Sequence, residues 1–244
     1  MSIRSLRSAM AFLTVLPAAR AKGEPGERLG RAYFPAIGAL IGLASGGVLL
    51  VASALFSPWL AAVAAVATMT VLTGALHLDG LADAADGLLG GGDAARRLEV
   101  MRDPRLGSFG TTTIVLVLIG EVTSVASMTP VRALSGLVIA GALSRLAMLA
   151  VVALVPYVRA SGLGVAAYDP AHRGFDLALG AAIAGIVCFI DWRRALVALP
   201  LVALTTGLVV VLARRRLGGA TGDVYGATSE LCLLATLVVF AARP

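Results

Sequence analysis

Charged residues are scarce in this chain of 244 residues: only 14% are Asp, Glu, Lys or Arg, whereas soluble domains average about 25%. Hydrophobic residues make up 59%, and several apolar runs reach or approach the ~20 residues that a membrane-crossing helix needs. Long polar stretches are lacking too, and none resembles a linker between domains. These deficits exclude a soluble protein and predict an all-α, polytopic transmembrane helical bundle that forms one integral-membrane domain over residues 1–244.

Aromatic residues are also few, at 5%, and no basic stripe interleaves with stacking side chains as a nucleic-acid surface would require. The net charge of +6 therefore does not indicate nucleic acid, which we exclude as a partner. The two cysteines, Cys188 and Cys232, both fall inside apolar runs. That position favours small core residues over a disulfide or a metal pair.

The apolar runs predict about seven membrane spans in the lipid bilayer, joined by short connections. The first 20 residues hold only a brief apolar stretch between basic residues, which predicts an interfacial amphipathic helix rather than a span. The spans are predicted at 33–56, 59–77, 109–128, 133–156, 175–190, 195–213 and 228–242.

The positive charges predict the orientation. With the N-terminus in the cytoplasm, fifteen of the 20 Lys and Arg residues lie on the cytoplasmic side, four lie on the other side, and Arg145 lies inside a span. Two polar, glycine-rich segments, 77–108 and 214–230, then share the cytoplasmic face. A composite active site requires such a shared face.

Three aspartates, Asp79, Asp83 and Asp86, directly follow the second apolar run. Their i, i+4, i+7 spacing places them on one face of a helix, where like charges repel one another. A divalent cation removes that conflict, and Mg²⁺ is commonly held by one or two carboxylates together with substrate phosphates. We therefore predict a Mg²⁺ site at these three residues. The alternatives are a solvated helix end and a cation-coupling site of a transporter.

Four arginines follow among turn-forming residues. Guanidinium groups bind phosphate oxygens in a bidentate way, and glycines allow close backbone approach. This pattern predicts phosphate binding, against the alternative that the arginines only set the topology. Glu99 and Asp103 either pair with these arginines or join the metal shell. The predicted substrate-binding residues are Arg96, Arg97, Arg102, Asp103, Arg105 and Gly107.

Asp223 and Glu230 belong to the second polar segment and are seven residues apart, so a helix would place them on one face. The segment's four glycines favour an irregular backbone over a regular helix throughout. A carboxylate at the start of an apolar run, as Glu230 is, predicts a functional role. Glu121 and Arg145 are intramembrane charges as well, and they form either a structural ion pair or part of a site.

Three motifs and one span resemble those of a single enzyme family. The motifs are HLDGLADAADGLLGG at 77–91, RRLEVMRDPRLGSFG at 96–110 and LGGATGDVYGATSEL at 217–231, and the span begins YFPAIGALIG at 33–42. In this order, and over essentially the whole chain, they resemble cobalamin synthase, the adenosylcobinamide-GDP ribazoletransferase family.

The resemblance implies a single Mg²⁺-dependent catalytic domain in the bacterial inner membrane. Its members transfer adenosylcobinamide phosphate from adenosylcobinamide-GDP to α-ribazole or α-ribazole 5′-phosphate, releasing GMP and forming adenosylcobalamin or its 5′-phosphate. A homo-oligomer and association with other cobalamin-pathway enzymes stay open. The resemblance implies functional roles for Asp79, Asp83, Asp86, Arg102, Asp103, Asp223 and Glu230.

A second family shares part of one motif. Residues 83–87 match the D-x-x-D-G opening of CDP-alcohol phosphotransferases, but the later G-x-x-x-D-x-x-x-D half is missing after Gly107. A phospholipid synthase is therefore an alternative function. A cation-coupled transporter is another, which the lack of an evident internal repeat disfavours. In the expected transferase mechanism, the ribose 3′-hydroxyl attacks phosphorus and Asp79, Asp223 or Glu230 accepts its proton.

Overall fold

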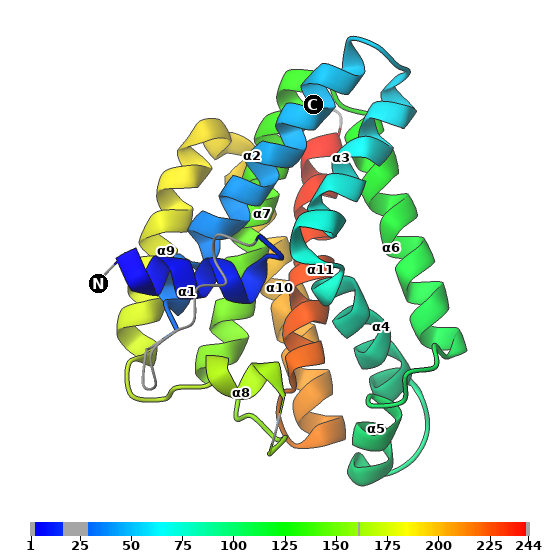
Figure 1. Cartoon of the computed structure of the whole chain (residues 1–244), viewed down its shortest axis with the longest axis vertical. Helices are drawn as coiled ribbons and strands as arrows, with labels where there is room; N and C mark the ends of the chain where they lie inside the picture. The colour runs from blue at the N-terminus through cyan, green and yellow to red at the C-terminus, as the bar shows by residue number, and fades with distance from the viewer. Residues whose placement is uncertain (1–2, 17–28, 161, 243–244) are drawn as a thin grey trace.

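The computed structural model describes residues 3–16, 29–160 and 162–242, and helices dominate it (Figure 1). No β-strand occurs in these ranges, so the predicted all-α class is confirmed. The helices are α1 (Ile3–Leu13), α2 (Phe34–Ser53), α3 (Pro58–Thr73), α4 (Leu76–Leu89), α5 (Ala94–Val100), α6 (Ser108–Ala126), α7 (Pro130–Leu154), α8 (Leu163–Ala167), α9 (Arg173–Cys188), α10 (Trp192–Leu217) and α11 (Gly222–Ala241), with 3₁₀ turns η2 (Arg31–Tyr33) and η3 (Phe189–Asp191).

The described residues contain five helical stretches that are long and apolar enough to cross a membrane, or six if the bent pair α3–α4 is one span. One stretch, α9 to α10, has 45 residues. A straight helix of that length would measure roughly 68 Å, about twice the bilayer core. Figure 1 instead shows α10 returning from η3 toward the end of the molecule where α9 begins. By length and composition the described helices thus give five or six candidate spans, and they reach the predicted seven only when α9 and α10 are counted as separate spans.

The second predicted span is not straight. It was expected to run to residue 77, but α3 ends at Thr73 and α4 leaves it at an angle of 88°. Gly74 and Ala75 both adopt left-handed backbone conformations, with φ of 62° and 57°. Glycine tolerates this conformation, whereas an alanine resists it because of its Cβ. The bend redirects α4, and with it all three aspartates, toward one end of the bundle.

Small residues let α2 and α7 pack closely at the centre. A Cβ added to Gly38 would lie 2.1 Å from the Gly141 carbonyl oxygen, and one added to Gly141 would lie equally close to the Gly38 oxygen. The two glycines thus allow the backbones of the helices to approach closely. Pro35 occupies the first turn of α2, where a missing N–H costs little.

Helix α1 lies across the long helices rather than along them (Figure 1). Its apolar side packs against the bundle through the buried Ala9 and Leu13, and the ring of Phe12 stacks on Phe34 with centroids 5.6 Å apart. The predicted amphipathic helix at the N-terminus is thus present. Its position brings Phe12 to the site described below.

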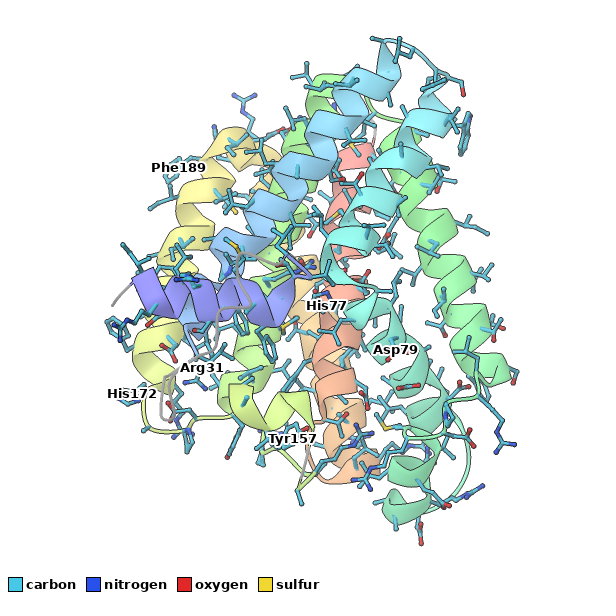
Figure 2. All side chains as sticks on the ribbon, in the orientation of Figure 1. Arg31, His77, Asp79, Tyr157, His172 and Phe189 are labelled. Atoms are coloured by element: carbon cyan, nitrogen blue, oxygen red, sulfur yellow. The ribbon has the colours of Figure 1, made fainter. Side chains whose placement is uncertain are left out.

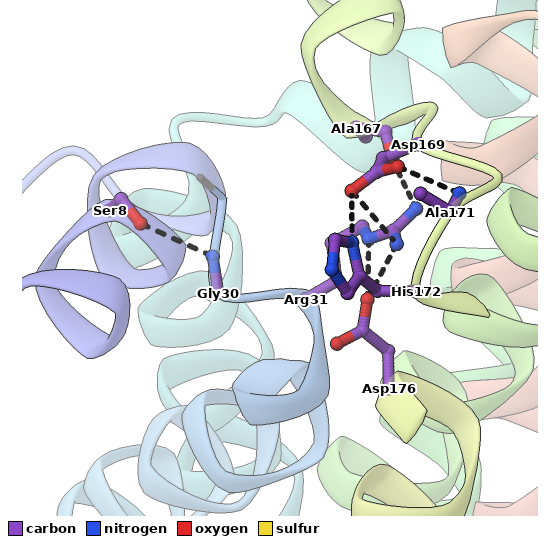
Figure 3. Close-up of polar contacts among 8 residues, drawn as sticks. All are labelled: Ser8, Gly30, Arg31, Ala167, Asp169, Ala171, His172 and Asp176. Carbon is purple, nitrogen blue, oxygen red and sulfur yellow. Dashed lines mark hydrogen bonds and ion pairs between the residues drawn. The ribbon is translucent and has the colours of Figure 1, made fainter. Parts of the chain in front are cut away.

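A buried ion pair anchors the connection between α7 and α9. Arg31 is fully buried, and its Nε donates to Asp176 Oδ2 at 3.0 Å while Nη1 donates to the Ala167 carbonyl at 2.9 Å (Figure 3). Asp169 lies beside this pair and also contacts His172, with 3.3 Å between Oδ2 and Nδ1. These contacts hold residues 167–176 against the start of α2.

The second polar segment is more regular than expected. Only residues 218–221 are non-helical, because α11 already begins at Gly222, where the Thr221 side chain caps it by accepting a hydrogen bond from the Val224 N–H. Asp223 and Glu230 therefore share one helix. The expected irregular backbone is confined to residues 218–221, and Gly226 lies inside the helix, where it serves packing rather than flexibility.

Candidate functional site

A cavity of about 210 Å³ lies between α4, α11 and the segment after α7, and we call it the α4–α11 cavity. Both polar segments contribute to it, as the prediction of a composite site requires. Figure 2 labels His77 and Asp79 at the start of α4 and Tyr157 on the segment after α7. The cavity is lined by Phe12, Leu76, His77, Asp79, Gly80, Met148, Tyr157, Arg159, Gly162, Gly164, Gly222, Asp223, Tyr225 and Gly226.

Two glycines bring α4 and α11 together beside the cavity. A Cβ on Gly226 would lie 3.0 Å from the His77 carbonyl oxygen, and a Cβ on Gly80 would lie 3.1 Å from the Asp223 Cα. Both distances are tighter than ordinary packing allows. The glycines next to the acidic motifs thus set the distance between the two helices, which places Asp79 and Asp223 on one cavity.

The three predicted metal ligands occupy different environments along α4. Asp79 is exposed and lines the cavity. Asp83, one turn further on, is half-buried. The negative charges of Asp223, Asp79 and Asp86 all act against its own. This confirms the repulsion that the spacing predicted, and it adds a fourth carboxylate from α11.

Asp86 is committed to the protein backbone. Its Oδ2 accepts a hydrogen bond from the Gly107 N–H at 2.8 Å, and its Oδ1 accepts one from the Gly110 N–H at 2.9 Å. These groups form the first turn of α6, whose unpaired N–H groups and dipole favour a carboxylate. A Cβ on Gly107 would lie 2.3 Å from Asp86 Oδ1, so the contact with Asp86 requires a glycine at this position.

The donor set suits Mg²⁺ through two of the three aspartates. In the described part of the chain, no three His, Cys, Asp or Glu side chains are grouped closely enough to hold a metal ion. Mg²⁺ needs only one or two carboxylates when substrate phosphates complete its shell, and the repelling Asp79 and Asp83 meet that requirement. Asp86 already has a partner for each oxygen. The Mg²⁺ site at these residues stays a prediction.

Arg97 is the most buried of the four predicted phosphate-binding arginines. It donates to the carbonyls of Gly87, Gly92 and Leu88, at 2.8, 2.9 and 3.0 Å. These bonds satisfy carbonyls around the C-terminal end of α4, a role that arginines often have at helix ends. These contacts give Arg97 a structural role that does not depend on a bound substrate.

The other predicted phosphate ligands lie on the surface. Arg96 pairs with Glu99 at 2.7 Å, and Arg105 pairs with Asp103 at 2.6 Å. Hydrogen bonds from the Arg105 side chain and backbone lower the pKa of Asp103 to about 2, so this carboxylate is charged at neutral pH. Arg102 is exposed. The sequence left open whether Glu99 and Asp103 pair with arginines or join the metal shell. In the structure both pair with arginines.

Sequence reasoning missed the arginine that lines the cavity. Arg159 Nη2 lies 2.7 Å from Asp223 Oδ2 and donates to the Met101 carbonyl at 3.3 Å. Its side chain is 11% exposed, and no described group accepts a hydrogen bond from its Nε. Arg159 was counted only as a topological charge, because it lies in a short connection far in sequence from both polar segments.

The backbone near Arg159 is fixed by a short parallel bridge. The Ala220 N–H donates to the Pro156 carbonyl at 2.8 Å, and the Val158 N–H donates to the Ala220 carbonyl at 3.0 Å. A Cβ on Gly219 would lie 2.4 Å from the Pro156 oxygen. The glycines before α11 thus allow the close contact that holds Arg159 against Asp223.

Glu230 lies away from the cavity in a buried polar cluster. Its Oε1 is 3.9 Å from His77 Nδ1, and the same nitrogen lies 3.2 Å from Arg145 Nη2. Glu121 is buried near this group and interacts electrostatically with Glu230 and Arg145. The intramembrane charges therefore meet in one cluster on α4, α6, α7 and α11, rather than forming a single ion pair.

Comparison with known proteins assigns the family. The family model for cobalamin-5-phosphate synthase matches residues 5–241. The chain belongs to the cobalamin-5-phosphate synthase family. It is 42% identical to an adenosylcobinamide-GDP ribazoletransferase of Azorhizobium caulinodans over 86% of this chain and 83% of the relative. Proteins of the same name from Stutzerimonas stutzeri and Bradyrhizobium diazoefficiens are 40% and 36% identical, over 94% and 98% of this chain and 94% of each relative. No solved structure matches.

Membership of the cobalamin-5-phosphate synthase family makes this chain an enzyme, and it decides against the lipid-synthase and transporter alternatives. The resemblance given by the three motifs is thereby confirmed. Arg159 lies outside those motifs. A signal for it existed only in the fold, where the segment after α7 comes to lie against the start of α11.

Proposed function

We propose that this chain transfers adenosylcobinamide phosphate from adenosylcobinamide-GDP to the ribose 3′-oxygen of α-ribazole or α-ribazole 5′-phosphate. One observation supports this most strongly. In a member of the cobalamin-5-phosphate synthase family, one cavity combines the exposed carboxylate of Asp79 with the guanidinium of Arg159. A cationic fork for a diphosphate and a base for a hydroxyl are what such a transfer requires.

The reaction forms one bond and breaks one. The 3′-oxygen of the ribazole attacks the phosphorus that is attached to cobinamide, the bond from that phosphorus to the bridging oxygen breaks, and GMP leaves with the bridging oxygen. The hydroxyl proton passes to a carboxylate. Arg159 binds the diphosphate oxygens in a bidentate way and stabilises the charge that develops on them.

Asp79 is the best placed of the three candidate bases. It is exposed and lines the cavity, so it can reach a substrate hydroxyl. Asp223 also lines the cavity, but its Oδ2 is already paired with Arg159 Nη2 at 2.7 Å, so it is less free than Asp79 to accept a proton. Glu230 lies in the buried cluster with His77. Asp83, one turn further along α4, would hold Mg²⁺ together with the substrate diphosphate and leave Asp79 free to accept the proton; when bound, the ion neutralises charge on that diphosphate.

We further propose that the enzyme lies in the bacterial inner membrane, with the cavity and the N-terminus on the cytoplasmic side. The lysine and arginine distribution supports this orientation. The water-soluble substrates then reach the cavity from the compartment in which nucleotides are made.

The test is direct. Purified protein in lipid vesicles is incubated with adenosylcobinamide-GDP, α-ribazole and Mg²⁺, and GMP and the corrinoid product are measured by mass spectrometry. We expect Asp79→Asn to lower kcat by about 10²–10⁴-fold, the usual contribution of a general base. Asp191→Asn is the control and should keep normal turnover, because Asp191 ends η3 beside Phe189, which Figure 2 shows far from His77, Asp79 and Tyr157. Absence of GMP with the wild-type protein would refute the proposed function.

A further inference from the structure

The lining of the α4–α11 cavity has two chemically different parts, a set of charged residues and a buried, largely apolar wall. Asp79, Arg159 and Asp223 supply the charges. The wall formed by Phe12, Leu76, His77, Met148 and Tyr225 is largely apolar and is buried or half-buried. A ligand that enters the cavity would therefore have a charged part and a flat or apolar part.

His77 has a defined tautomer in this wall. Its Nδ1 lies 3.2 Å from Arg145 Nη2. A guanidinium has only N–H donors, so Nδ1 must be the acceptor of this contact. The proton of the neutral imidazole is then on Nε2, which makes Nε2 a hydrogen-bond donor. Arg145 thus acts as a positioning residue for the ring of His77.

Two polar atoms of the wall have no partner within the described residues. They are His77 Nε2 and the Tyr225 hydroxyl, and both are fully buried. Buried polar groups in proteins are nearly always hydrogen-bonded, and an unmade bond costs about 1–3 kcal/mol. One donor and one hydroxyl in an apolar wall next to charged groups suit a bound ligand.

The volume of the cavity limits which part of the substrates the wall can bind. A corrin macrocycle with its amide side chains is far larger than about 210 Å³, so the cobinamide must stay outside. Guanine presents donors and acceptors along two edges and would leave several of them unpaired against Leu76 and Met148. A benzimidazole is flat and apolar, with one unsubstituted ring nitrogen that only accepts.

We propose that this wall binds the benzimidazole base of α-ribazole, with His77 Nε2–H donating to the unsubstituted ring nitrogen. The proposal rests on the proposed function and names the subsite of one substrate. The ribose then extends toward Asp79, which brings its hydroxyl to the candidate base. Tyr157 and Tyr225, with ring centroids 6.0 Å apart, provide aromatic surface beside the base.

The test uses an analogue of α-ribazole in which this ring nitrogen is replaced by C–H, giving a dimethylindole riboside. We expect wild-type enzyme to show a KM about 3- to 10-fold higher for the indole analogue, the usual effect of one neutral hydrogen bond. His77→Leu should raise the KM for α-ribazole to that of the analogue and abolish the preference. The KM for adenosylcobinamide-GDP should not change.

Two further variants cover the case in which His77→Leu does not fold. A glutamine amide reaches the position of Nε2, whereas an asparagine amide reaches that of Nδ1. We therefore expect His77→Gln to keep the preference for α-ribazole and His77→Asn to lose it. Equal KM values for the two nucleosides with wild-type enzyme would overturn the proposal, as would a preference that persists in both His77→Leu and His77→Asn.

A separate measurement distinguishes this proposal from the proposed function. The intrinsic fluorescence of α-ribazole reports its binding to the full-length protein without adenosylcobinamide-GDP or Mg²⁺. Loss of binding in His77→Leu and recovery in His77→Gln would support the base subsite even if no GMP formed. Binding of equal strength in all three proteins would overturn it even if turnover were normal. An effect of His77→Leu on the KM for adenosylcobinamide-GDP alone would assign the wall to guanine and also overturn it.

Discussion

Replacement of Asp86 by asparagine separates a structural carboxylate from a metal-binding one. Both oxygens of Asp86 accept hydrogen bonds from backbone N–H groups in the first turn of α6. Asparagine keeps one acceptor oxygen and turns the other group into a donor that faces an N–H. The change therefore removes one charge-assisted hydrogen bond and the charge that interacts with the dipole of α6.

The expected loss of stability follows from these two contributions. A hydrogen bond to a charged group is worth about 1.5–3 kcal/mol, and a carboxylate at a helix N-terminus adds about 0.3–1 kcal/mol. We expect Asp86→Asn to lower the free energy of unfolding by about 2 kcal/mol or more. For a chain of this size, that lowers Tm by about 4–8 °C. Asp79→Asn, on an exposed side chain of the same helix, should change Tm by no more than about 2 °C.

The assay combines thermal unfolding in detergent with Mg²⁺ titration of turnover, at a temperature where the Asp86→Asn and Asp83→Asn proteins are both folded. Asp86→Asn should show a lower Tm and a nearly normal apparent Mg²⁺ affinity. Asp83→Asn, which removes a proposed Mg²⁺ ligand, should show a nearly normal Tm and a weakened apparent Mg²⁺ affinity. An unchanged Tm for Asp86→Asn together with a strongly weakened Mg²⁺ affinity would refute the structural role and restore Asp86 as a metal ligand.

Three further predictions concern neighbouring groups. Arg159→Met should lower kcat/KM for adenosylcobinamide-GDP by about 10- to 100-fold, because the phosphate loses a charge-assisted contact, as steady-state kinetics will measure. Gly226→Ala should lower the free energy of unfolding by about 1–3 kcal/mol, because its Cβ would lie 3.0 Å from the His77 carbonyl oxygen. Gly207 has open space around it, so the control Gly207→Ala should leave the Tm within about 2 °C of wild type. Arg97→Met should lower Tm through the carbonyls left without donors, and an increased KM for adenosylcobinamide-GDP at unchanged Tm would show instead that Arg97 binds substrate.

The sequence alone was sufficient for properties that depend on local composition. Apolar runs of about 20 residues have one stable form in lipid, because only a helix satisfies its own backbone hydrogen bonds there, and the fold class follows. Helical spacing likewise placed Asp79, Asp83 and Asp86 on α4, where they are found. The long motifs indicated the family, since they contain enough residues in fixed order to be specific.

The sequence could not separate residues that bind ligands from residues that bind the backbone. Arg97 and Asp86 have the composition expected of a phosphate and metal site, but carbonyls of α4 and N–H groups of α6 already occupy them. Spacing along one helix does not reveal which neighbouring helix end a side chain will meet. The bend at Gly74 was equally hidden, because an apolar run looks the same whether it is straight or turned by 88°.

The composition of the site was decided by tertiary structure. Arg159 and Asp223 are 64 positions apart in the numbering, yet their side chains pair at 2.7 Å because a parallel bridge fixes one segment against the other. His77 became a defined donor only through Arg145, which packs beside it from another helix. Local sequence determined which segments are helical and apolar. The close contacts made by glycines and buried charges between those segments determined which side chains share a cavity.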